Sequence, residues 1–313
     1  MRQQRGVALI TAVLIMALVA ATAVAMASKQ QLDIRRSANI FNNDIAYLFV
    51  LGAEDYARNV LEWDITQDKS TIDHTGENWA QTVSVPVEGA MLTGTLQDLQ
   101  GRINLNSLID ANGKPNALMQ TRFKRLLKQL DLDDAIADAV LDWIDEDITP
   151  TGFGGAEDDV YMLETPPYRA ANNLMVSSSE LMSIKGIDAE TYEKLAPFVA
   201  TLPVSDTKIN INTAPAEVLA TLTSSLTVAD GEALVEARGE EGFATLADFT
   251  QHSLMINHQI PKNEQDSLDV QSAYFMLGAA AEFDQSIAYL HSVLKRDNNN
   301  GEVRVVMRSR GAY

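Results

Sequence analysis

The first 27 residues constrain the fold of this chain more than any other segment. Residues 1–6 are polar and carry Arg2 and Arg5, and residues 7–27 follow without a charged side chain. An apolar helix of about 20 residues is long enough to span the hydrocarbon core of a bilayer. Basic residues beside such a helix favour the cytoplasmic side. The sequence therefore predicts one membrane-spanning helix, with the chain after Ala27 exported.

Three processing schemes fit this start. A secretory peptidase could cut at Ala25-x-Ala27, or the helix could be a plain membrane anchor. In the third scheme a prepilin-type leader is cut after Gly6, and the mature chain begins at Val7. The third is favoured because the apolar run exceeds the about 7–15 residues of a secretory h-region and helical spacing continues towards Glu62. The secretory scheme remains an alternative.

Charge and cysteine content restrict the possible functions. The chain has 43 acidic and 24 basic residues, a formal net charge of −19, and no cysteine among its 313 residues. It cannot form disulfides, and its charge repels nucleic acid phosphates and anionic lipid head groups. Metal cations and basic partner surfaces suit such a chain better.

Beyond the membrane segment the sequence pattern changes twice. Residues 79–109 alternate between polar and apolar, residues 116–266 show helical spacing, and residues 270–310 alternate again. The predicted class is α+β: a long N-terminal transmembrane helix, an antiparallel sheet domain, and a large inserted all-α domain. The predicted parts are a leader (1–6), the transmembrane part of the helix (7–27), the exported helix with the first strands (28–109), the inserted α-domain (110–269) and the returning strands (270–313).

An acidic run is the candidate site. Between Lys128 and Arg169 there are twelve acidic residues and no Lys or Arg. Carboxylates this dense repel one another unless a cation or solvent relieves the repulsion. Calcium suits them, because it takes about six to eight oxygen ligands in flexible geometry.

The run is not an EF-hand. Asp145-x-Asp147 opens like one, but Pro150 and Ala156 stand where that loop needs Gly and Glu. Two interpretations remain from the residues alone. One is a calcium loop of another kind within residues 144–173, and the other is a solvated acidic helix end followed by a polar loop.

The chain resembles the K-type minor pseudopilins of bacterial type II secretion systems over nearly its whole length. The motifs that carry the resemblance lie at the leader junction, in the acidic run and after it. They are Arg5-Gly-Val-Ala-Leu9, Leu141-Asp-Trp-Ile-Asp-Glu-Asp147, Gly155-Ala-Glu-Asp-Asp159 with Tyr161, Pro166-Pro-Tyr-Arg-Ala-Ala-Asn-Asn173, Ser179-Glu-Leu181 and Ile209-Asn-Ile-Asn-Thr-Ala-Pro215.

The resemblance implies a pseudopilin-type sheet domain and a place at the tip of a periplasmic pseudopilus. A prepilin peptidase would cut after Gly6 and methylate Val7, leaving a single-pass inner-membrane protein with its C-terminal domain in the periplasm. The subunit would start assembly with the I- and J-type minor pseudopilins and aid export of folded proteins across the outer membrane. Secreted cargo and the outer-membrane secretin are further candidate partners.

The resemblance also implies calcium in the acidic loop, as a structural ion. The expected carboxylate ligands are Asp145, Asp147, Glu157, Asp158 and Asp159, and the amide of Asn172 is a further candidate. Trp143 is expected to brace this loop.

Thr11 occupies the fifth position of the predicted mature chain. Most pseudopilins carry Glu there, which would pair with a neighbour's amino terminus inside the membrane, where an unpaired charge is costly. The resemblance implies that K-type members usually lack this Glu, which suits a subunit with nothing stacked above it. The alternative is that the hydroxyl of Thr11 simply bonds within its own helix.

Two segments suggest a different function. Residues 181–188 and 211–249 have the helix–turn–helix pattern of helix-hairpin-helix modules, which grip DNA phosphates through backbone N–H groups. This would make the chain a membrane-tethered periplasmic DNA-binding protein. Residues 180–250 hold few basic residues (Lys185, Lys194, Lys208 and Arg238) among many acids. Helix packing is therefore the favoured role, and no nucleic acid partner is expected.

Catalysis is not expected. The four histidines, His74, His252, His258 and His291, are scattered without metal-ligand spacing. The chain has no cysteine nucleophile, Gly-x-Ser-x-Gly elbow or phosphate-binding loop.

Overall fold

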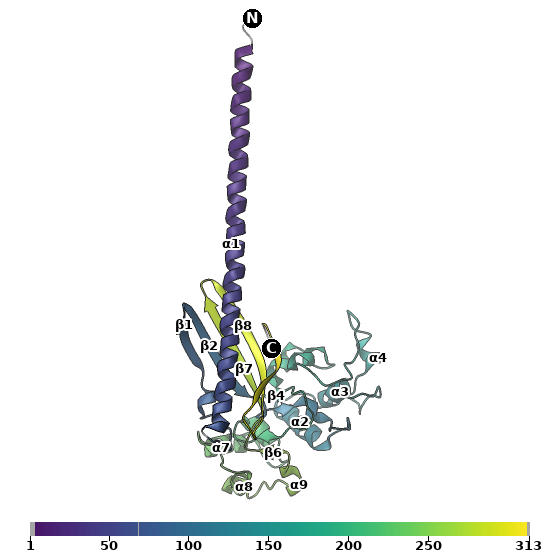
Figure 1. The fold of residues 1–313 in the computed structure, drawn as a ribbon. Coiled ribbons are helices and arrows are strands. Elements are labelled where there is room, and N and C mark those ends of the chain that lie inside the picture. Colours follow the sequence, from purple (N-terminus) through teal and green to yellow (C-terminus); the bar gives the residue numbers. More distant parts are fainter. Residues whose placement is uncertain (1–3, 68, 312–313) are drawn as a thin grey trace.

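A computed structural model describes residues 4–67 and 69–311, so residues 1–3 of the predicted leader lie outside the described part (Figure 1). The longest element is α1 (Gln4–Thr66), a helix of 63 residues. At 1.5 Å rise per residue it is about 95 Å long. Helix α1 is long and apolar enough to cross a membrane, and no other described part of the protein covers its apolar stretch. This agrees with the predicted transmembrane helix.

Five antiparallel strands form the sheet that α1 packs against. They are β1 (Val83–Val87), β2 (Ala90–Asp98), β7 (Tyr274–Phe283), β8 (Ser286–Arg296) and β9 (Val303–Ser309), in the spatial order β1-β2-β7-β8-β9. The 3-10 turn η1 (Asn78–Ala80) precedes β1. Early and late strands of the chain therefore share one sheet, which confirms the predicted class.

The lower half of α1 supplies one side of the sheet domain's core. Ala46, Val50 and Leu61 are buried against sheet residues such as Phe275 and Leu290. Small alanines on this face let the helix approach the sheet closely. Fully burying a side chain the size of leucine stabilises a fold by roughly 1.5–3 kcal/mol, so this face fixes α1 to the sheet.

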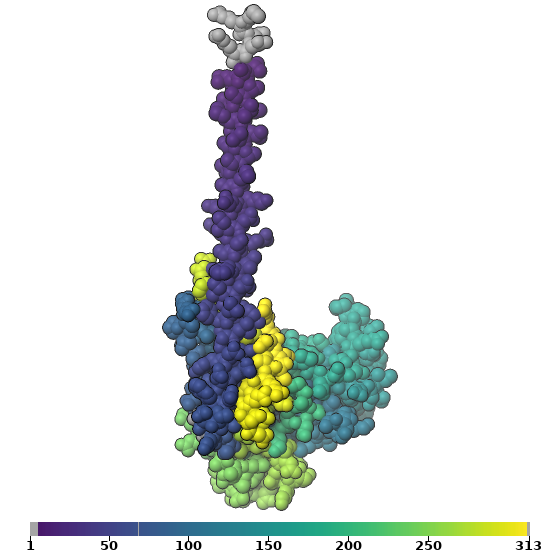
Figure 2. Space-filling model, viewed as in Figure 1, coloured from purple at the N-terminus to yellow at the C-terminus, as the bar shows by residue number. Residues whose placement is uncertain are grey.

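The chain between β2 and β7, residues 99–273, forms the inserted unit that we call the α-domain. It lies beside and beyond the sheet, at the end of α1 far from the N-terminus (Figures 1 and 2). Its longer helices are α2 (Ala117–Gln129), α3 (Ala135–Ile144), α5 (Ala189–Leu195) and α7 (Val228–Arg238). Its short elements are β3 (Ile103–Asn104), η2 (Leu105–Leu108), α4 (Asp158–Tyr161), η3 (Ser178–Ser183), β4 (Val199–Ala200), β5 (Ile209–Asn210), α6 (Ala216–Ala220), α8 (Leu246–Thr250), η4 (Ser253–Met255), α9 (Lys262–Gln265) and β6 (Leu268–Asp269). The short strands pair in parallel, β3 with β4 and β5 with β6.

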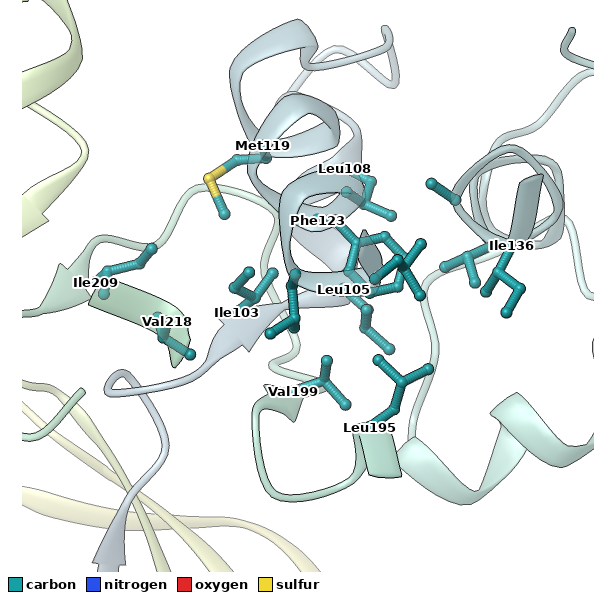
Figure 3. Close-up of a cluster of buried hydrophobic side chains, with 14 of the residues drawn as sticks. Ile103, Leu105, Leu108, Met119, Phe123, Ile136, Leu195, Val199, Ile209 and Val218 are labelled. Atoms are coloured by element: carbon teal, nitrogen blue, oxygen red, sulfur yellow. The ribbon is translucent and has the colours of Figure 1, made fainter. Parts of the chain in front are cut away.

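The α-domain has its own hydrophobic core, centred on α2. Phe123 from this helix is fully buried among Leu105, Leu108 and Ile136, which come from η2 and α3 (Figure 3). Val218 from the second half of the domain belongs to the same core cluster. One continuous core therefore holds both halves of the α-domain together.

A buried polar joint connects the α-domain to the sheet. The guanidinium of Arg296, fully buried at the end of β8, lies 2.6 Å from carboxylate oxygens of both Asp64 and Asp73. The amide of Asn210, in the α-domain, donates to the backbone oxygen of Asp73 and to the carboxylate of Asp98, both at 3.0 Å. The chain enters the α-domain just after Asp98, so this joint fixes the domain where it leaves the sheet.

Candidate metal centre

The acidic loop begins where α3 ends, and a buried aspartate on α3 shapes it. The carboxylate of Asp142 accepts hydrogen bonds from the backbone N–H groups of Thr151, at 3.0 Å, and Ala156, at 2.8 Å. These bonds fold the loop back onto the helix. The sequence pattern placed Asp142 in the acidic run but did not indicate this role.

Aromatic side chains brace the other side of the loop. The ring of Trp143 packs edge-on against that of Tyr161, with 5.3 Å between centroids, and its indole N–H lies 3.2 Å from Glu180. Both Trp143 and Tyr161 are buried. The expected bracing role of Trp143 agrees with this packing.

Three of the expected ligands meet at one point. Asp145, Asp147 and Glu157 each offer a carboxylate oxygen, and these oxygens all lie within 4.8 Å of one another. Asp145 and Glu157 are almost fully buried, at 5% and 3% exposure, whereas Asp147 faces solvent. A cation at this point would be reachable from solvent past Asp147.

Several buried oxygens here have no hydrogen-bond partner among the described residues. They are one oxygen of Asp145, both carboxylate oxygens of Glu157 and the amide oxygen of Asn172. The NH₂ group of Asn172 donates to the backbone oxygen of Asp147 at 3.0 Å, which orients its amide. Leaving buried polar atoms unpaired is costly, and native proteins rarely do it. A hard cation held by Asp145, Asp147 and Glu157 would relieve this cost at the carboxylates, so the donor set fits calcium.

Electrostatics reinforces this fit. Burial, together with the nearby Asp142, Asp145 and Asp147, raises the pKa of Glu157 to about 7. Burial and the charges of Asp147 and Asp142 raise the pKa of Asp145 to about 6. Without a counter-charge, both carboxylates therefore ionise at a higher pH than exposed acids do. A divalent cation bound between them would favour the ionised forms and so lower both pKa values.

The two other expected carboxylate ligands, Asp158 and Asp159, are not part of the cluster formed by Asp145, Asp147 and Glu157. One oxygen of Asp158 accepts the backbone N–H of Ala170 at 3.1 Å, and the other lies 3.7 Å from the guanidinium of Arg169. Asp159 is exposed on α4. Consecutive residues of a helical turn point in different directions, so adjacency in sequence did not bring these carboxylates to the same place as Glu157.

A second carboxylate group lies in the polar joint. Oxygens of Asp64, Asp73 and Glu77 also lie within 4.8 Å of one another. Here the guanidinium of Arg296 already neutralises Asp64 and Asp73. Glu77 accepts the indole N–H of Trp79 at 2.7 Å. This group is an internal ion-pair network and does not present open oxygens to a metal.

The residues expected at the processed terminus lie on α1. Gly6 and Val7 are part of the continuous helix, and Val7 is exposed. The hydroxyl of Thr11 lies 3.1 Å from the backbone oxygen of Val7 and 3.0 Å from that of Ala8. Thr11 therefore satisfies its own polar group within the helix and requires no partner side chain.

The basic side chains of residues 180–250, which contain the helix-hairpin-helix-like segments, all have partners within this chain. Lys194 pairs with Glu190 at 2.8 Å, and Lys208 with Asp269 at 3.0 Å. Arg238 is buried and donates to two backbone oxygens, those of Ile211 and Ala214. Lys185 donates to Gly155 of the acidic loop. These contacts favour the packing role over phosphate binding.

Comparison with known proteins identifies the family. Two profiles of the family described as type II secretion system (T2SS), protein K, match residues 101–204 and 209–271, which is most of the α-domain. The type II secretion system protein K of Pseudomonas aeruginosa is 37% identical, covering 99% of this chain and 94% of that protein. The protein K of Aeromonas hydrophila is 33% identical, covering 96% and 95%.

A solved structure shares the fold. The similar chain belongs to the crystal structure of the GspK-GspI-GspJ complex from the type 2 secretion system of enterotoxigenic Escherichia coli. It matches this chain with a TM-score of 0.77 and 24% sequence identity. The match covers 89% of this chain and all of the solved one. The resemblance seen in the sequence motifs is thus confirmed: the chain belongs to the protein K family of the type II secretion system, the K-type minor pseudopilins.

Proposed function

We propose that this subunit stands at the periplasmic tip of the pseudopilus, where it starts assembly with the I- and J-type minor pseudopilins and so aids export of folded proteins across the outer membrane. The observation that carries the proposal is the position of the α-domain. It forms a broad mass at the end of α1 far from the predicted membrane segment (Figure 2). A subunit stacked beyond it would collide with this mass, so the shape suits a cap. The similar solved chain was crystallised in a GspK-GspI-GspJ complex, which supports the choice of partners.

We propose that this chain is processed and oriented in the membrane as pseudopilins are. Prepilin peptidase removes residues 1–6 and methylates Val7, and α1 anchors the protein in the inner membrane with its C-terminal domain in the periplasm. The unbroken run of α1 from Gln4 to Thr66 supports this scheme, because the membrane segment and the sheet-packed segment are one rod. The Thr11 hydroxyl, bonded within the helix, is compatible with a subunit that pairs with no amino terminus above it.

We also propose a structural calcium ion in the acidic loop. Asp145, Asp147, Glu157 and the amide oxygen of Asn172 are its protein ligands, and Asp158 and Asp159 border the site. The unpaired buried oxygens support this assignment. The ion would fix residues 145–172 against α3, and so define the outer surface of the α-domain. Secreted cargo or the secretin would contact the α-domain at this outer end.

Co-purification tests the tip proposal. The full chain is expressed with its I- and J-type partners, extracted in detergent and isolated by an affinity tag on this chain. Recovery of a complex containing one copy of each partner is the expected result. Recovery of this chain without either partner, from membranes in which both are present, contradicts the proposal.

A further inference from the structure

A basic segment of α1 lies directly beyond its predicted membrane-spanning part. This segment, residues 28–43, contains three basic side chains, Lys29, Arg35 and Arg36, and one acidic side chain, Asp33. All four are exposed. The whole chain carries a formal net charge of −19, so the basic segment runs against the overall composition. The repulsion from anionic lipid head groups that the net charge predicts therefore does not apply to this segment.

The position of the basic segment places it at the membrane surface. Residues 7–27 of α1 span about 32 Å, which matches the roughly 30 Å hydrocarbon core of a bilayer. Lys29 lies about 3 Å beyond the end of this span, and Arg36 lies about 14 Å beyond it. The polar head-group layer on each side of the core is about 5–8 Å thick. Lys29 therefore falls inside this layer, and the backbone of Arg35 and Arg36 lies just outside it.

Helix geometry directs the two arginine side chains back towards the head groups. In an α-helix the Cα–Cβ bonds tilt towards the N-terminus, which is the membrane end of α1. Long basic side chains extend along a helix and place their charge in the polar layer while their stems cover apolar surface. The guanidinium groups of Arg35 and Arg36 can therefore reach the layer that already holds the ammonium group of Lys29.

The protein itself does not neutralise the basic segment. Within the described part of the chain, no ion pair includes Lys29, Arg35 or Arg36. Asp33 lines the same shallow strip of helix surface as Lys29 and Arg36. Three positive charges less this one negative charge leave the segment with a net charge of +2. Its counter-charge must come from outside the chain.

Lys29 and Arg36 lie on the side of α1 that the sheet covers further along the helix. They are seven residues apart, and Val50 follows Arg36 by two further intervals of seven. Seven residues are close to two full helical turns, so all three share one side of the helix. Val50 is buried in the core between α1 and the sheet. The chain's own sheet domain therefore hinders another subunit from reaching this side, and lipid head groups suit it better than protein side chains.

We propose that Lys29, Arg35 and Arg36 bind the phosphates of anionic phospholipids in the periplasmic leaflet and so fix the height of α1 in the membrane. This inference rests on the proposed membrane orientation and adds a lipid partner to it. Charge selects the lipid: the phosphate of a zwitterionic head group is offset by its own cation, whereas phosphatidylglycerol keeps a net negative charge. Each basic residue close to an anionic membrane surface strengthens the attraction by about fivefold.

Energy transfer from a dye on α1 to labelled lipid tests the proposal, because the natural chain has no cysteine that would compete for the dye. The full-length chain with Ser28→Cys carries the donor dye and is reconstituted into phosphatidylcholine vesicles that contain a minor share of phosphatidylglycerol. A trace of acceptor dye is attached to the acyl chain of one lipid or the other. We expect phosphatidylglycerol to be enriched around α1 at least about threefold over phosphatidylcholine, and the enrichment to fall in high salt.

Two triple variants of the labelled chain separate the basic segment from net charge. The first combines Lys29→Gln, Arg35→Gln and Arg36→Gln. The second removes the same charge from three exposed lysines of the α-domain, by Lys114→Gln, Lys128→Gln and Lys262→Gln. Both are expected to melt with the natural chain, and only the first is expected to abolish the lipid enrichment.

The outcomes distinguish the lipid site from the membrane anchor. Equal enrichment in the first variant and the unsubstituted labelled chain, or loss of enrichment in both variants, overturns the proposal. If alkaline carbonate releases the natural chain from the vesicles, the proposed membrane anchoring fails and the lipid site fails with it. If the chain stays embedded but shows no preference for phosphatidylglycerol, the lipid site alone fails.

Discussion

The carboxylate of Asp142 lies 2.8 Å from the backbone nitrogen of Ala156, fourteen residues further along the chain. It also accepts the N–H of Thr151. One buried side chain of α3 therefore closes the acidic loop before any cation contributes. This closure places Glu157, the next residue, opposite Asp145 and Asp147.

Removing this closure should loosen the calcium loop. Asp142→Ala leaves the N–H groups of Thr151 and Ala156 without their acceptor, and each unpaired buried group costs about 1–3 kcal/mol. We expect a lower melting temperature and weaker calcium binding, measured by thermal unfolding and isothermal titration of the full chain. Asp142→Asn keeps one acceptor oxygen and should lose less. Equal calcium affinity in Asp142→Ala and the natural chain would show that the loop does not depend on this closure.

The choice of ligands can be tested with two neighbouring acids. Glu157→Gln removes the charge from a buried carboxylate with two unpaired oxygens, and Asp159→Asn changes an exposed one nearby. We expect Glu157→Gln to lower calcium affinity at least about tenfold, since a bound cation needs that charge. Without calcium the same variant should melt higher, because it no longer buries an unpaired carboxylate. Asp159→Asn should behave like the natural chain in both measurements. If Asp159→Asn lost more calcium affinity than Glu157→Gln, the ion would lie closer to α4.

Calcium stabilisation should depend on pH. The pKa of Glu157, about 7, and that of Asp145, about 6, lie above the ordinary values of 4.5 and 3.8. Because these pKa values are raised in the folded state, the calcium-free protein is stabilised below the ordinary values and loses that stability as pH rises through 6 and 7. Calcium binds the ionised forms, so the rise in melting temperature with calcium should grow between about pH 5 and pH 8. Calorimetry with and without a chelator measures it, and a calcium effect that shrinks over this range speaks against the site.

The polar joint should contribute strongly to the stability with which the α-domain is held against the sheet. Arg296→Met leaves Asp64 and Asp73 buried without their guanidinium, and breaking a buried ion pair in this way costs about 3–5 kcal/mol. The control is Arg304→Met, which breaks a solvent-exposed pair with Glu302 worth about 0–1 kcal/mol. Thermal unfolding of the full chain should separate the two variants clearly. Indistinguishable melting curves would mean that the joint contributes little.

Local sequence patterns predicted the elements whose neighbours lie close in the chain. The alternation around Asp297-Asn-Asn-Asn-Gly301 predicted two late strands, and the structure has β8 and β9 there. Helical spacing predicted α1 as far as Glu62, and the helix ends at Thr66. Gly52 does not break this helix, because a glycine inside a long helix costs only about 1 kcal/mol relative to alanine.

The features that the sequence could not predict depend on long-range contacts. Arg296 and Asp73 are 223 residues apart, and no local pattern pairs them. Among the expected ligands, Asp145, Asp147 and Glu157 converge because Asp142 folds the loop back, a closure that composition does not encode. The side-chain NH₂ of Asn172 donates to the backbone oxygen of Asp147, 25 residues earlier, another contact that no local pattern predicts.

The mature amino terminus tests the central claim most directly, since every proposed assembly contact uses α1 as a retained stem. Mass spectrometry of the protein purified from cell membranes should find an N-terminal peptide that begins at Val7 and carries one added methyl group. A mature chain beginning at Ser28, free of the apolar helix, would contradict the account.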